Sequence, residues 1–549
     1  MKHWKILHDS GEVDSNIDAI IDVIFTNRNI EKRDRDAFLR TTTDDLTLAG
    51  VGIDQKEYEK FVRRIEQAIK NEEKIIIFGD YDVDGITASA ILWETLYSKT
   101  KKIIPYIPDR MDEGYGLSVK GIENVLKEHP DTKLIITVDN GIVAFDAVEY
   151  AAKKGIDVVV TDHHVKGKKL PDAFALIHTT SLCGAGIAWV LARELGYESK
   201  SNIEEKRSLA GLATIADLVP LTQFNRALVK EGIKELKKTK RYGLIELLKK
   251  AAVEKETISV YTLGHIIGPR LNATGRIQSA MNALRLICTT NPLKAKELAM
   301  MLTTINEERQ GLTEESVAHA KLAVLEYPSE SRVVVVSDPS YSQGIIGLIA
   351  SQLVESTYRP SFAISKGEEI SKGSARSIPG VNIIELLRSV SHTLIEAGGH
   401  PMAAGFSLET EKISAFMEAI SKQAEKVIPQ ELLERYITID MLLPFPSISQ
   451  KLVQEIEKLE PFGMGNFEPV FASEDVVVRE VRKIGRDQNH LKMKVEKDGK
   501  VFDAIGFRFV DKVDIMQGDI ISIAYVIDEN EWNGKKSLQL KIRDIKPQS

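Results

Sequence analysis

The chain has little cysteine, no long hydrophobic run and no excess of positive charge, and each absence argues against a class of protein. Only two cysteines, Cys183 and Cys288, occur among 549 residues, so neither a disulfide framework nor a cysteine-based metal site is expected. No apolar stretch approaches the roughly 20 residues that span a bilayer, and the first residues lack a signal-peptide pattern. We therefore expect a cytoplasmic protein with no membrane contact. The net charge of −7 disfavours bulk electrostatic binding of nucleic acid, although an acidic total can hide a basic groove.

What the chain does have is the length and the pattern of several α/β units. At 549 residues it exceeds one ordinary core, so two to four domains are expected. In the first third, short β-branched runs alternate with helical patterns, which predicts a parallel sheet with crossover helices. The predicted strands are 74–78, 103–107, 134–138 and 158–160, and the helices between them are 87–96 and 119–127. The region before residue 70 is expected to be largely helical.

The rest of the chain divides into three further segments. Helical periodicity from Pro292 to about residue 327, with Gly311 as the only glycine, predicts a helix that connects two domains. A second α/β unit starts at 332–336, and short β segments after residue 436 predict a small barrel such as an OB-fold. The expected organisation is N-terminal helices with an α/β domain (1–290), a connector helix (291–328), a second α/β domain (329–432) and a barrel (433–549).

Three short clusters of aspartate and histidine each follow an apolar strand-like run. They are Asp80–Gly85, Val138–Asn140 and Asp162–His164, and Asp217 is a further candidate. Carboxylates and imidazoles at the carboxyl ends of parallel strands converge on one crevice. Oxygen ligands with a few nitrogens suit Mn²⁺ or Mg²⁺. Two such cations bridged by one carboxylate would lower the pKa of a water and clamp an in-line displacement at phosphorus, so the clusters predict a two-metal phosphoesterase.

Alternative interpretations of these clusters are weaker. Asp80–Gly85 matches the start of an EF-hand loop, but the twelfth position is Ile91, where a bidentate glutamate is required. Aspartates also cap helices after strands, yet three at alternate positions exceed what a cap needs. Asp139 alone would be an ordinary strand-end residue, and a single histidine after a strand is more often structural. The combination of clusters favours the metal site.

Two glycine-rich stretches could hold phosphate oxygens. They are Gly398-Gly399-His400 and Gly373–Ser377, in which Arg376 could bind a phosphate through two hydrogen bonds. Glycines let backbone N–H groups approach oxygens closely. Without the upstream clusters, both stretches could equally be plain turns.

At this point the motifs resemble a known family. Asp82 and Asp84, Asp139, Asp162-His163-His164 and Asp217 resemble the four motifs of the DHH phosphoesterase superfamily, and 398–400 resembles the signature of its DHHA1 domain. Further stretches are similar to the RecJ family of exonucleases specific for single-stranded DNA. These stretches are 79–87, 114–118, 269–276 and 461–466. The resemblance covers nearly the whole chain from about residue 20.

The resemblance implies a parallel-sheet DHH domain, a long helix, a DHHA1 domain and a C-terminal OB-fold, and it implies roles for individual residues. Those implied to hold metal or act in catalysis are Asp80, Asp82, Asp84, Asp139 (as the bridge), His163, His164 and Asp217. Those implied to contact substrate are His164, Arg276, Ser374, Arg376, Ser377, Gly399 and His400. Aromatic residues of the OB-fold that could stack on bases are Phe502, Phe507 and Tyr525.

The chain departs from the family pattern in three places. Ser342 stands where a histidine is expected, and Phe467 replaces a common proline. The chain also ends soon after the OB-like segment, so the extra carboxyl-terminal domain of some relatives is expected to be absent.

The implied function is a metal-dependent 5′→3′ exonuclease that hydrolyses single-stranded DNA to nucleoside 5′-monophosphates in DNA repair and recombination. Two divalent cations, Mn²⁺ or Mg²⁺, would serve as cofactors. A single-strand-binding protein and other repair proteins would be its partners by analogy. A DHH phosphodiesterase of short oligonucleotides or cyclic dinucleotides is the enzymatic alternative, but those relatives lack an OB-like unit. A non-catalytic replication scaffold would be expected to have lost ligands, and every candidate ligand is present here. A DHH inorganic pyrophosphatase would need no third unit.

Overall fold

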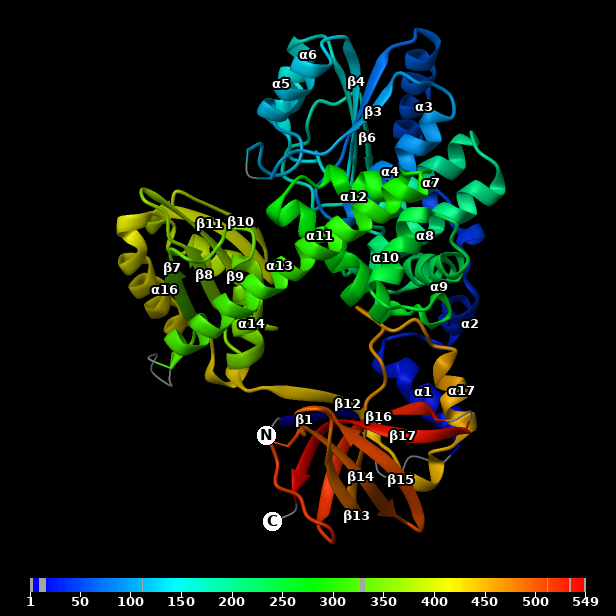
Figure 1. Cartoon of the computed structure of the whole chain (residues 1–549), viewed down its shortest axis with the longest axis vertical. Helices are drawn as coiled ribbons and strands as arrows, with labels where there is room; N and C mark the ends of the chain where they lie inside the picture. The colour runs from blue at the N-terminus through cyan, green and yellow to red at the C-terminus, as the bar shows by residue number, and fades with distance from the viewer. Residues whose placement is uncertain are drawn as a thin grey trace. The chain divides into compact units, whose positions relative to one another are not determined.

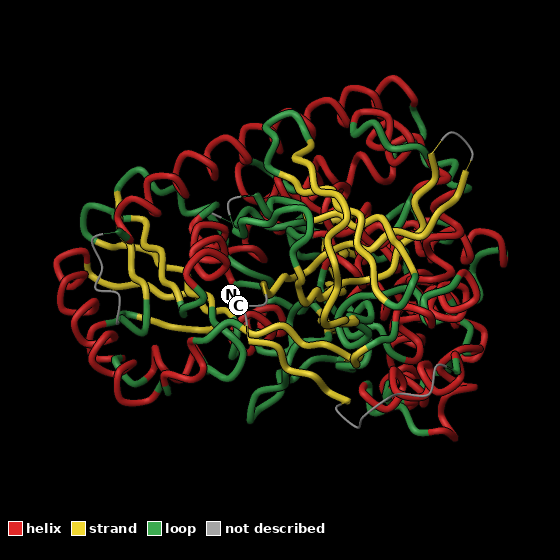
Figure 2. Tube along the Cα trace, turned by 90° about the horizontal axis from the view of Figure 1, so that it is seen from below, coloured by secondary structure: helices red, strands yellow, loops and turns green. Residues whose placement is uncertain are grey.

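The computed structural model describes residues 3–8, 16–110, 112–325, 331–510, 512–532 and 535–547. The chain forms two compact units. Figure 2 traces the chain with helices in red and strands in yellow. The first, here the catalytic unit, contains 28–306 and 455–468, and the second contains 1–27, 307–454 and 469–549. The sequence passes from one unit to the other within helix α13 (Pro292–Val324). No helix among the described residues is long and apolar enough to cross a membrane.

The catalytic unit is built on the predicted parallel sheet. Its strands are β3 (Ile103–Tyr106), β2 (Lys74–Phe78), β4 (Thr132–Val138), β5 (Asp157–Asp162) and β6 (Ala175–His178), in that spatial order. Every neighbouring pair is parallel. The four predicted strands are therefore confirmed, and β6 is added at the edge.

Helices cover both faces of this sheet (Figure 1). On one face, Ile75 and Ile77 pack in a core with α3 (Gln55–Lys70), α4 (Val83–Tyr97) and α7 (Gly184–Leu195). On the other face, Ile76 and Phe78 pack with α5 (Val119–Glu128) and α6 (Phe145–Lys153). Burial on both faces explains why the strands are continuous apolar runs rather than alternating ones. Polar residues of these strands are therefore confined to their ends.

A second group of helices completes the catalytic unit. The helices are α2 (Arg35–Arg40), α8 (Lys200–Ala216), α9 (Gln223–Lys237), α10 (Tyr242–Lys250), α11 (Gly268–Ile277) and α12 (Met281–Cys288). Helices α8 and α9 approach closely at two glycines, since a Cβ at Gly232 would lie 2.6 Å from the Arg207 carbonyl oxygen. Helix α8 ends at Ala216, and Asp217, the last predicted ligand, follows as its C-cap.

The second unit contains the second predicted α/β domain. Its sheet has the order β10 (Glu396–His400), β11 (Ala403–Glu409), β9 (Ile370–Arg376), β8 (Ser361–Ser365) and β7 (Val334–Asp338). Only β7 and β8 are parallel. Helices α15 (Ile383–Arg388) and α16 (Ile413–Val427) pack on one face, and α14 (Ile346–Thr357) with the end of α13 packs on the other. The predicted connector residues 326–328 lie outside the described residues.

The C-terminal strands close into the predicted small barrel. Strands β13 (Phe471–Ile484), β14 (His490–Lys497), β15 (Lys500–Gly506), β17 (Lys535–Pro547) and β16 (Ile520–Trp532) follow one another, and β16 pairs back to β13. The sheet is extended by β12 (Tyr436–Leu442) and then by β1 (His3–His8), both paired in parallel. Helices α1 (Ile17–Asn27) and α17 (Gln450–Glu457) complete the described helices.

Strand β1 was not among the predicted elements, because the region before residue 70 was expected to be largely helical. Its residues alternate between exposed and half-buried, as in an edge strand with one covered face. Its partner β12 lies more than 400 residues away in the sequence, so no local pattern indicates the pairing.

Candidate metal and phosphate site

The loop after β2 presents three carboxylates within five residues. Asp82 caps α4: its Oδ1 accepts hydrogen bonds from the backbone N–H groups of Asp84 (2.9 Å) and Gly85 (3.1 Å). A Cβ at Gly85 would lie 2.5 Å from the Asp80 backbone nitrogen, so only glycine lets α4 begin this close to the loop. Asp80 and Asp84 are each about 1% exposed. The local sequence therefore folds so that Asp80, Asp82 and Asp84 lie together.

Asp139 follows β4 in a strained backbone conformation, with φ of +64°. A non-glycine residue in this region costs about 1–3 kcal/mol and persists only when its surroundings hold it there. Asn140 supplies that support: its side-chain amide donates to the carbonyls of Phe78 (3.2 Å) and Val138 (2.9 Å), and its Oδ1 accepts from Leu117 N–H (3.1 Å). Asn140 thus joins β2 to β4 and aims Asp139, a role that the sequence did not reveal.

Asp162 orients the two histidines that follow it. Its Oδ1 accepts hydrogen bonds from the backbone N–H of His163 (2.7 Å) and lies 2.7 Å from His164 Nδ1, while its Oδ2 accepts from Ile142 N–H. Burial lowers the pKa of His164, but its contact with the Asp162 carboxylate outweighs burial and raises that pKa to about 9. His164 is therefore positively charged at neutral pH, and its Nε2 lies 3.0 Å from the Tyr115 hydroxyl.

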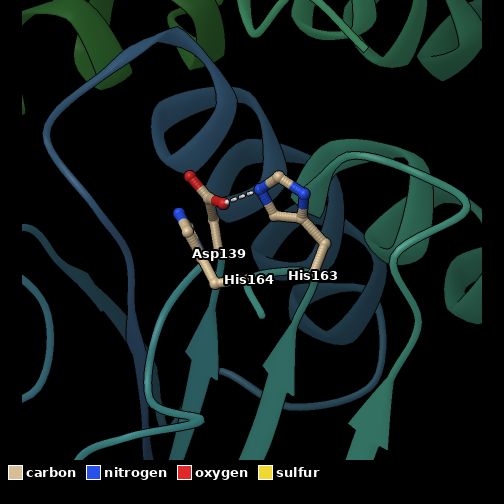
Figure 3. A group of neighbouring side chains, drawn as sticks. All are labelled: Asp139, His163 and His164. Atoms are coloured by element: carbon tan, nitrogen blue, oxygen red, sulfur yellow. Dashed lines mark ion pairs between the residues drawn. The ribbon is translucent and has the colours of Figure 1, made fainter. Parts of the chain in front are cut away.

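The predicted ligands converge at the carboxyl ends of β2, β4 and β5. His163 Nε2 lies 3.1 Å from Asp139 Oδ1, 3.7 Å from Asp84 Oδ2 and 3.6 Å from Asp217 Oδ2. Figure 3 shows Asp139, His163 and His164 together above the strand ends. Three overlapping groups have ligand atoms within 4.8 Å of one another: Asp139, His163 and His164; Asp84, His163 and Asp217; Asp80, Asp82 and Asp139. The structure thus brings together the six predicted metal ligands and His164, the predicted phosphate contact.

The electrostatics of the cluster fit divalent cations. Asp80 Oδ1 and Asp139 Oδ1 are buried and have no hydrogen-bond partner among the described residues. Burial and then the neighbouring carboxylates raise the pKa of Asp80 and Asp139 well above the usual value, and raise that of Asp217 to about 8. An ionised carboxylate is costly to bury unless a positive charge, such as a divalent cation, lies beside it. Burial also lowers the pKa of His163, which keeps its imidazole neutral and able to bind a metal.

Two further groups shape the cluster, and the sequence analysis gave no role to either. The backbone N–H groups of Gly184 and Ala185, at the start of α7, each donate to the Asp84 carboxylate at 2.6 Å. Asn272 on α11 accepts a hydrogen bond from Val83 N–H (2.8 Å) and so fixes the start of α4. Asn272 lies within the family-like stretch 269–276, which was the only sequence signal for it.

Among the predicted substrate contacts, Arg276 belongs to the catalytic unit. It lies on α11, beside Gly275, where a Cβ would be 2.6 Å from the Tyr81 carbonyl oxygen. This close packing places the end of α11 against the Asp80–Asp84 loop.

The other predicted contacts lie on the sheet of the second unit. Arg376 on β9 is in register with Ala403 on β11, which is in register with His400 on β10. Residues paired directly across neighbouring strands project to the same face. Ser374, Gly405 and Gly398 form the next row of that face, and a Cβ at either glycine would meet no atom within 4 Å. This face is therefore open over β10 and β11, whereas Gly347 at the start of α14 lies close to Arg376 and Ser374 on β9.

Within this face, Arg376 donates a hydrogen bond to the Ser374 hydroxyl (3.0 Å). Gly399 adopts φ of +140°, which favours glycine. Ser377 is buried instead, and its hydroxyl donates to the Val381 carbonyl oxygen (2.7 Å). The structure groups Ser374, Arg376 and His400 but gives Ser377 a structural hydrogen bond.

The aromatic residues of the barrel differ in whether their rings are exposed and can stack on bases. Tyr525 is fully buried and its hydroxyl lies 2.9 Å from that of Ser473, so the expectation that it stacks on bases is wrong. Tyr525 projects to the same side of β16 as Ile521 and Ile523, and both of these are buried as well. Phe507 is 51% exposed, with its ring 5.3 Å from that of His490.

A parallel sheet with these ligands at its carboxyl edge, followed by a second α/β domain, defines a DHH-type phosphoesterase. Residues 74–218 match the DHH family N-terminal domain and residues 330–426 match the DHHA1 domain. Residues 439–544 match the RecJ OB domain.

The full-length relatives specify the family. The chain is 31% identical to the single-stranded-DNA-specific exonuclease RecJ of Haemophilus influenzae, over 96% of each protein. It is 36% identical to that of Bacillus subtilis, covering 89% of this chain and 63% of that protein. Its fold matches RecJ of Thermus thermophilus in complex with Mn²⁺, with a TM-score of 0.83, 28% identity, and coverage of 100% of this chain and 80% of that one. The chain belongs to the RecJ family.

Proposed function

We propose that this protein is a metal-dependent exonuclease that hydrolyses single-stranded DNA from its 5′ end to nucleoside 5′-monophosphates. The observation that carries the proposal is the convergence of Asp84, Asp139, His163 and Asp217, together with the buried Asp139 Oδ1, for which the described part of the chain provides no hydrogen bond. Family membership supports the substrate class, because the relatives are named as exonucleases specific for single-stranded DNA.

The donor set suits two divalent cations, Mn²⁺ or Mg²⁺, and the Thermus relative is described with each ion. The residues that would hold them are Asp80, Asp82, Asp84, Asp139, His163 and Asp217, with Asp139 shared between the two. When bound, the cations activate water at neutral pH and neutralise charge that develops on the phosphate oxygens.

The remaining side chains of the site position the substrate. His164 carries a positive charge at neutral pH and is suited to hold a non-bridging phosphate oxygen beside the metal ligands. Asp162 keeps His164 charged, and Tyr115 restricts the orientation of its ring. Their arrangement requires no covalent nucleophile from the protein.

The face that carries Ser374, Arg376 and His400 suits a terminal phosphate. Arg376 offers a planar donor group, and the glycine rows of β10 and β11 let an anion approach the backbone. We assign Arg276, from the catalytic unit, to a neighbouring phosphate. Recognition of a 5′-phosphate at this face is the finer part of the proposal, and it gives the enzyme its polarity.

The OB domain distinguishes this function from the alternatives. Its exposed Phe507 beside His490 can stack on a base, and stacking tolerates any sequence. A phosphodiesterase of short oligonucleotides would not need such a domain. The proposal also includes domain limits at 1–290, 291–328, 329–432 and 433–549. It further includes partnership with a single-strand-binding protein and a cytoplasmic location.

Digestion of single strands labelled at either end tests the proposal. We expect strands labelled at the 5′ end to release labelled mononucleotide first. This release should occur with Mn²⁺ and not with EDTA. Release from the 3′ label first would contradict the polarity, and digestion of dinucleotides but not of long strands would favour the short-oligonucleotide enzyme.

A further inference from the structure

Residues 455–468 run from the last turn of α17 toward β13 of the barrel, yet they belong to the catalytic unit. The whole segment lies within the part of the chain that matches the RecJ OB domain. At its centre is a tight turn, here the 463–466 turn, closed by hydrogen bonds in both directions between Gly463 and Asn466 (2.8 and 3.1 Å). A piece of the C-terminal region is therefore built into the unit that holds the metal site.

The 463–466 turn packs on the loop that begins with Asp217. Leu221 N–H donates to the Met464 carbonyl oxygen at 2.7 Å. Gly465 has φ of +73°, and a Cβ there would come within 3.0 Å of the Pro220 Cβ. At Gly463, a Cβ would come within 2.7 Å of Leu221 Cδ1. The left-handed backbone and the contact with Pro220 together favour glycine at position 465, whereas at position 463 only the end of the Leu221 side chain would have to move.

Arg226 and Asn466 hold the segment in place. The Arg226 side chain is 1% exposed and donates to the carbonyl oxygens of Lys458 (2.8 Å) and Glu460 (2.6 Å), as well as to that of Phe38. The Asn466 amide donates to the carbonyls of Leu459 (2.8 Å) and Pro461 (3.0 Å). A buried guanidinium costs free energy unless its donors are used, and here they fix the backbone of two segments far apart in sequence.

The loop after Asp217 is held by the end of α8 at its start. The N–H groups of Asp217, Leu218 and Val219 donate to the carbonyl oxygens of Ala213 (2.9 Å), Ile215 (3.3 Å) and Thr214 (3.2 Å). Leu218 then takes a left-handed conformation with φ of +57° and is 65% exposed. Pro220 and Leu221 follow, and they are the residues that the turn contacts. The direction in which the Asp217 carboxylate leaves α8 is therefore set by the helix on one side and by the turn on the other.

We propose that the 463–466 turn is a positioning element for Asp217 and thereby sets the affinity of the metal site. The consequence is that the C-terminal region contributes to catalysis by placing a metal ligand, in addition to any grip on DNA. This inference rests on the proposed role of Asp217 as a metal ligand. Groups that orient metal ligands typically change metal affinity by about 10–100-fold when they are altered.

Calorimetric titration of the full chain with Mn²⁺, in the absence of DNA, tests the proposal without relying on activity. Gly465→Ala should weaken Mn²⁺ binding by about tenfold or more, because the new Cβ displaces Pro220. Gly155→Ala is the matched control: its φ of +69° imposes similar backbone strain in the same unit, but a Cβ there meets no atom within 4 Å. Its Mn²⁺ affinity should equal that of the parent chain.

Arg226→Lys is a second variant that loosens the 463–466 turn, because lysine cannot donate to all three carbonyl oxygens that Arg226 contacts. It tests the positioning role if Gly465→Ala does not fold. Asp217→Asn separates the assignment of Asp217 as a metal ligand from the positioning role of the 463–466 turn. Weaker binding in Asp217→Asn, with parental binding in folded Gly465→Ala or Arg226→Lys, would overturn the positioning role alone. Parental binding in Asp217→Asn would overturn the assignment of Asp217 and the positioning role with it. An equal loss in Gly155→Ala would also overturn the proposal, because general strain would then explain the effect.

Discussion

Gly184 lies so close to Asp139 that a Cβ at position 184 would come within 2.5 Å of the Asp139 Cβ and 3.0 Å of its Cα. The same glycine donates its N–H to the Asp84 carboxylate at 2.6 Å. One backbone position therefore supports two of the proposed ligands, and it also starts α7.

Gly184→Ala is expected to reduce cleavage by about 10–100-fold, because the new methyl group displaces Asp139, and displacing a metal ligand weakens metal binding. The variant should still fold, as shown by circular dichroism. Gly311→Ala is the control: it lies within α13, its Cβ would meet no atom within 4 Å, and helix stability should rise by about 1 kcal/mol with activity unchanged. Full activity in Gly184→Ala would contradict the strict placement of Asp139.

Asp139→Asn should reduce turnover by on the order of 10³-fold, because the neutral amide cannot balance two cations that supply several kcal/mol to the transition state. Binding of single-stranded DNA should remain measurable by fluorescence anisotropy. Asp146→Asn changes an exposed aspartate in the first turn of α6 and should leave turnover unchanged. Turnover near the parental level in folded Asp139→Asn would rule out a shared ligand.

Removal of the metal should have a pH-dependent effect on stability. The pKa of Asp217, about 8, lies above its ordinary value because of burial and neighbouring carboxylates, and those of Asp80 and Asp139 are raised as well. Without cations, the folded state therefore holds more protons than the unfolded state. Its free energy of unfolding should fall as pH rises from about 4 to 8, by about 1.4 kcal/mol per pH unit for each proton retained.

Bound cations remove this penalty because they replace the protons. Mn²⁺ should therefore raise the melting temperature more at pH 8 than at pH 6, as measured by scanning fluorimetry in parallel with EDTA samples. Asp217→Asn, with one titrating group fewer, should show a smaller difference between the two pH values. Equal Mn²⁺ shifts at both pH values in the parent chain would show that the carboxylates are already ionised without metal.

Arg376→Ala should slow digestion of strands with a 5′-phosphate more than digestion of strands with a 5′-hydroxyl, because the guanidinium is proposed to hold the terminal phosphate. Initial rates on the two substrates, compared at equal concentration, give the selectivity. Lys372→Ala is the control, because it removes a cation from the same strand that is paired with Glu396 (3.1 Å). This variant should not alter the selectivity for a 5′-phosphate. Equal losses on both substrates would mean that Arg376 follows the backbone of the strand generally.

Much of the fold and of the metal site could be predicted because both leave local patterns. Apolar runs mark β2, β4 and β5, and ligands that follow such runs must meet at one edge of a parallel sheet. The supports of the site could not be predicted this way. Asn140, Gly184 and the 463–466 turn act through contacts between segments distant in sequence, and their residue types are common in ordinary turns. Only the folded chain shows what they touch.

Tyr525 and Phe507 show the same limit in the barrel. The sequence offers both as aromatic residues in β-rich segments. Tyr525 lies on the buried side of β16, in line with Ile521 and Ile523, whereas Phe507 follows the end of β15 and stays exposed. Phe507→Ala should therefore weaken binding of single-stranded DNA by about 1–3 kcal/mol, the usual value of one base–aromatic stack. Anisotropy titration in EDTA measures binding without cleavage.

Two control variants make the Phe507 result specific. Val501→Ala shortens another exposed apolar side chain of the barrel that has no aromatic face, and DNA affinity should not change. Tyr525→Phe removes the hydrogen bond to Ser473, which should cost about 1 kcal/mol of stability without affecting DNA affinity. If Tyr525→Phe weakened DNA binding as much as Phe507→Ala, the effect would come from the barrel as a whole, and the assignment of Phe507 as a stacking platform would fail.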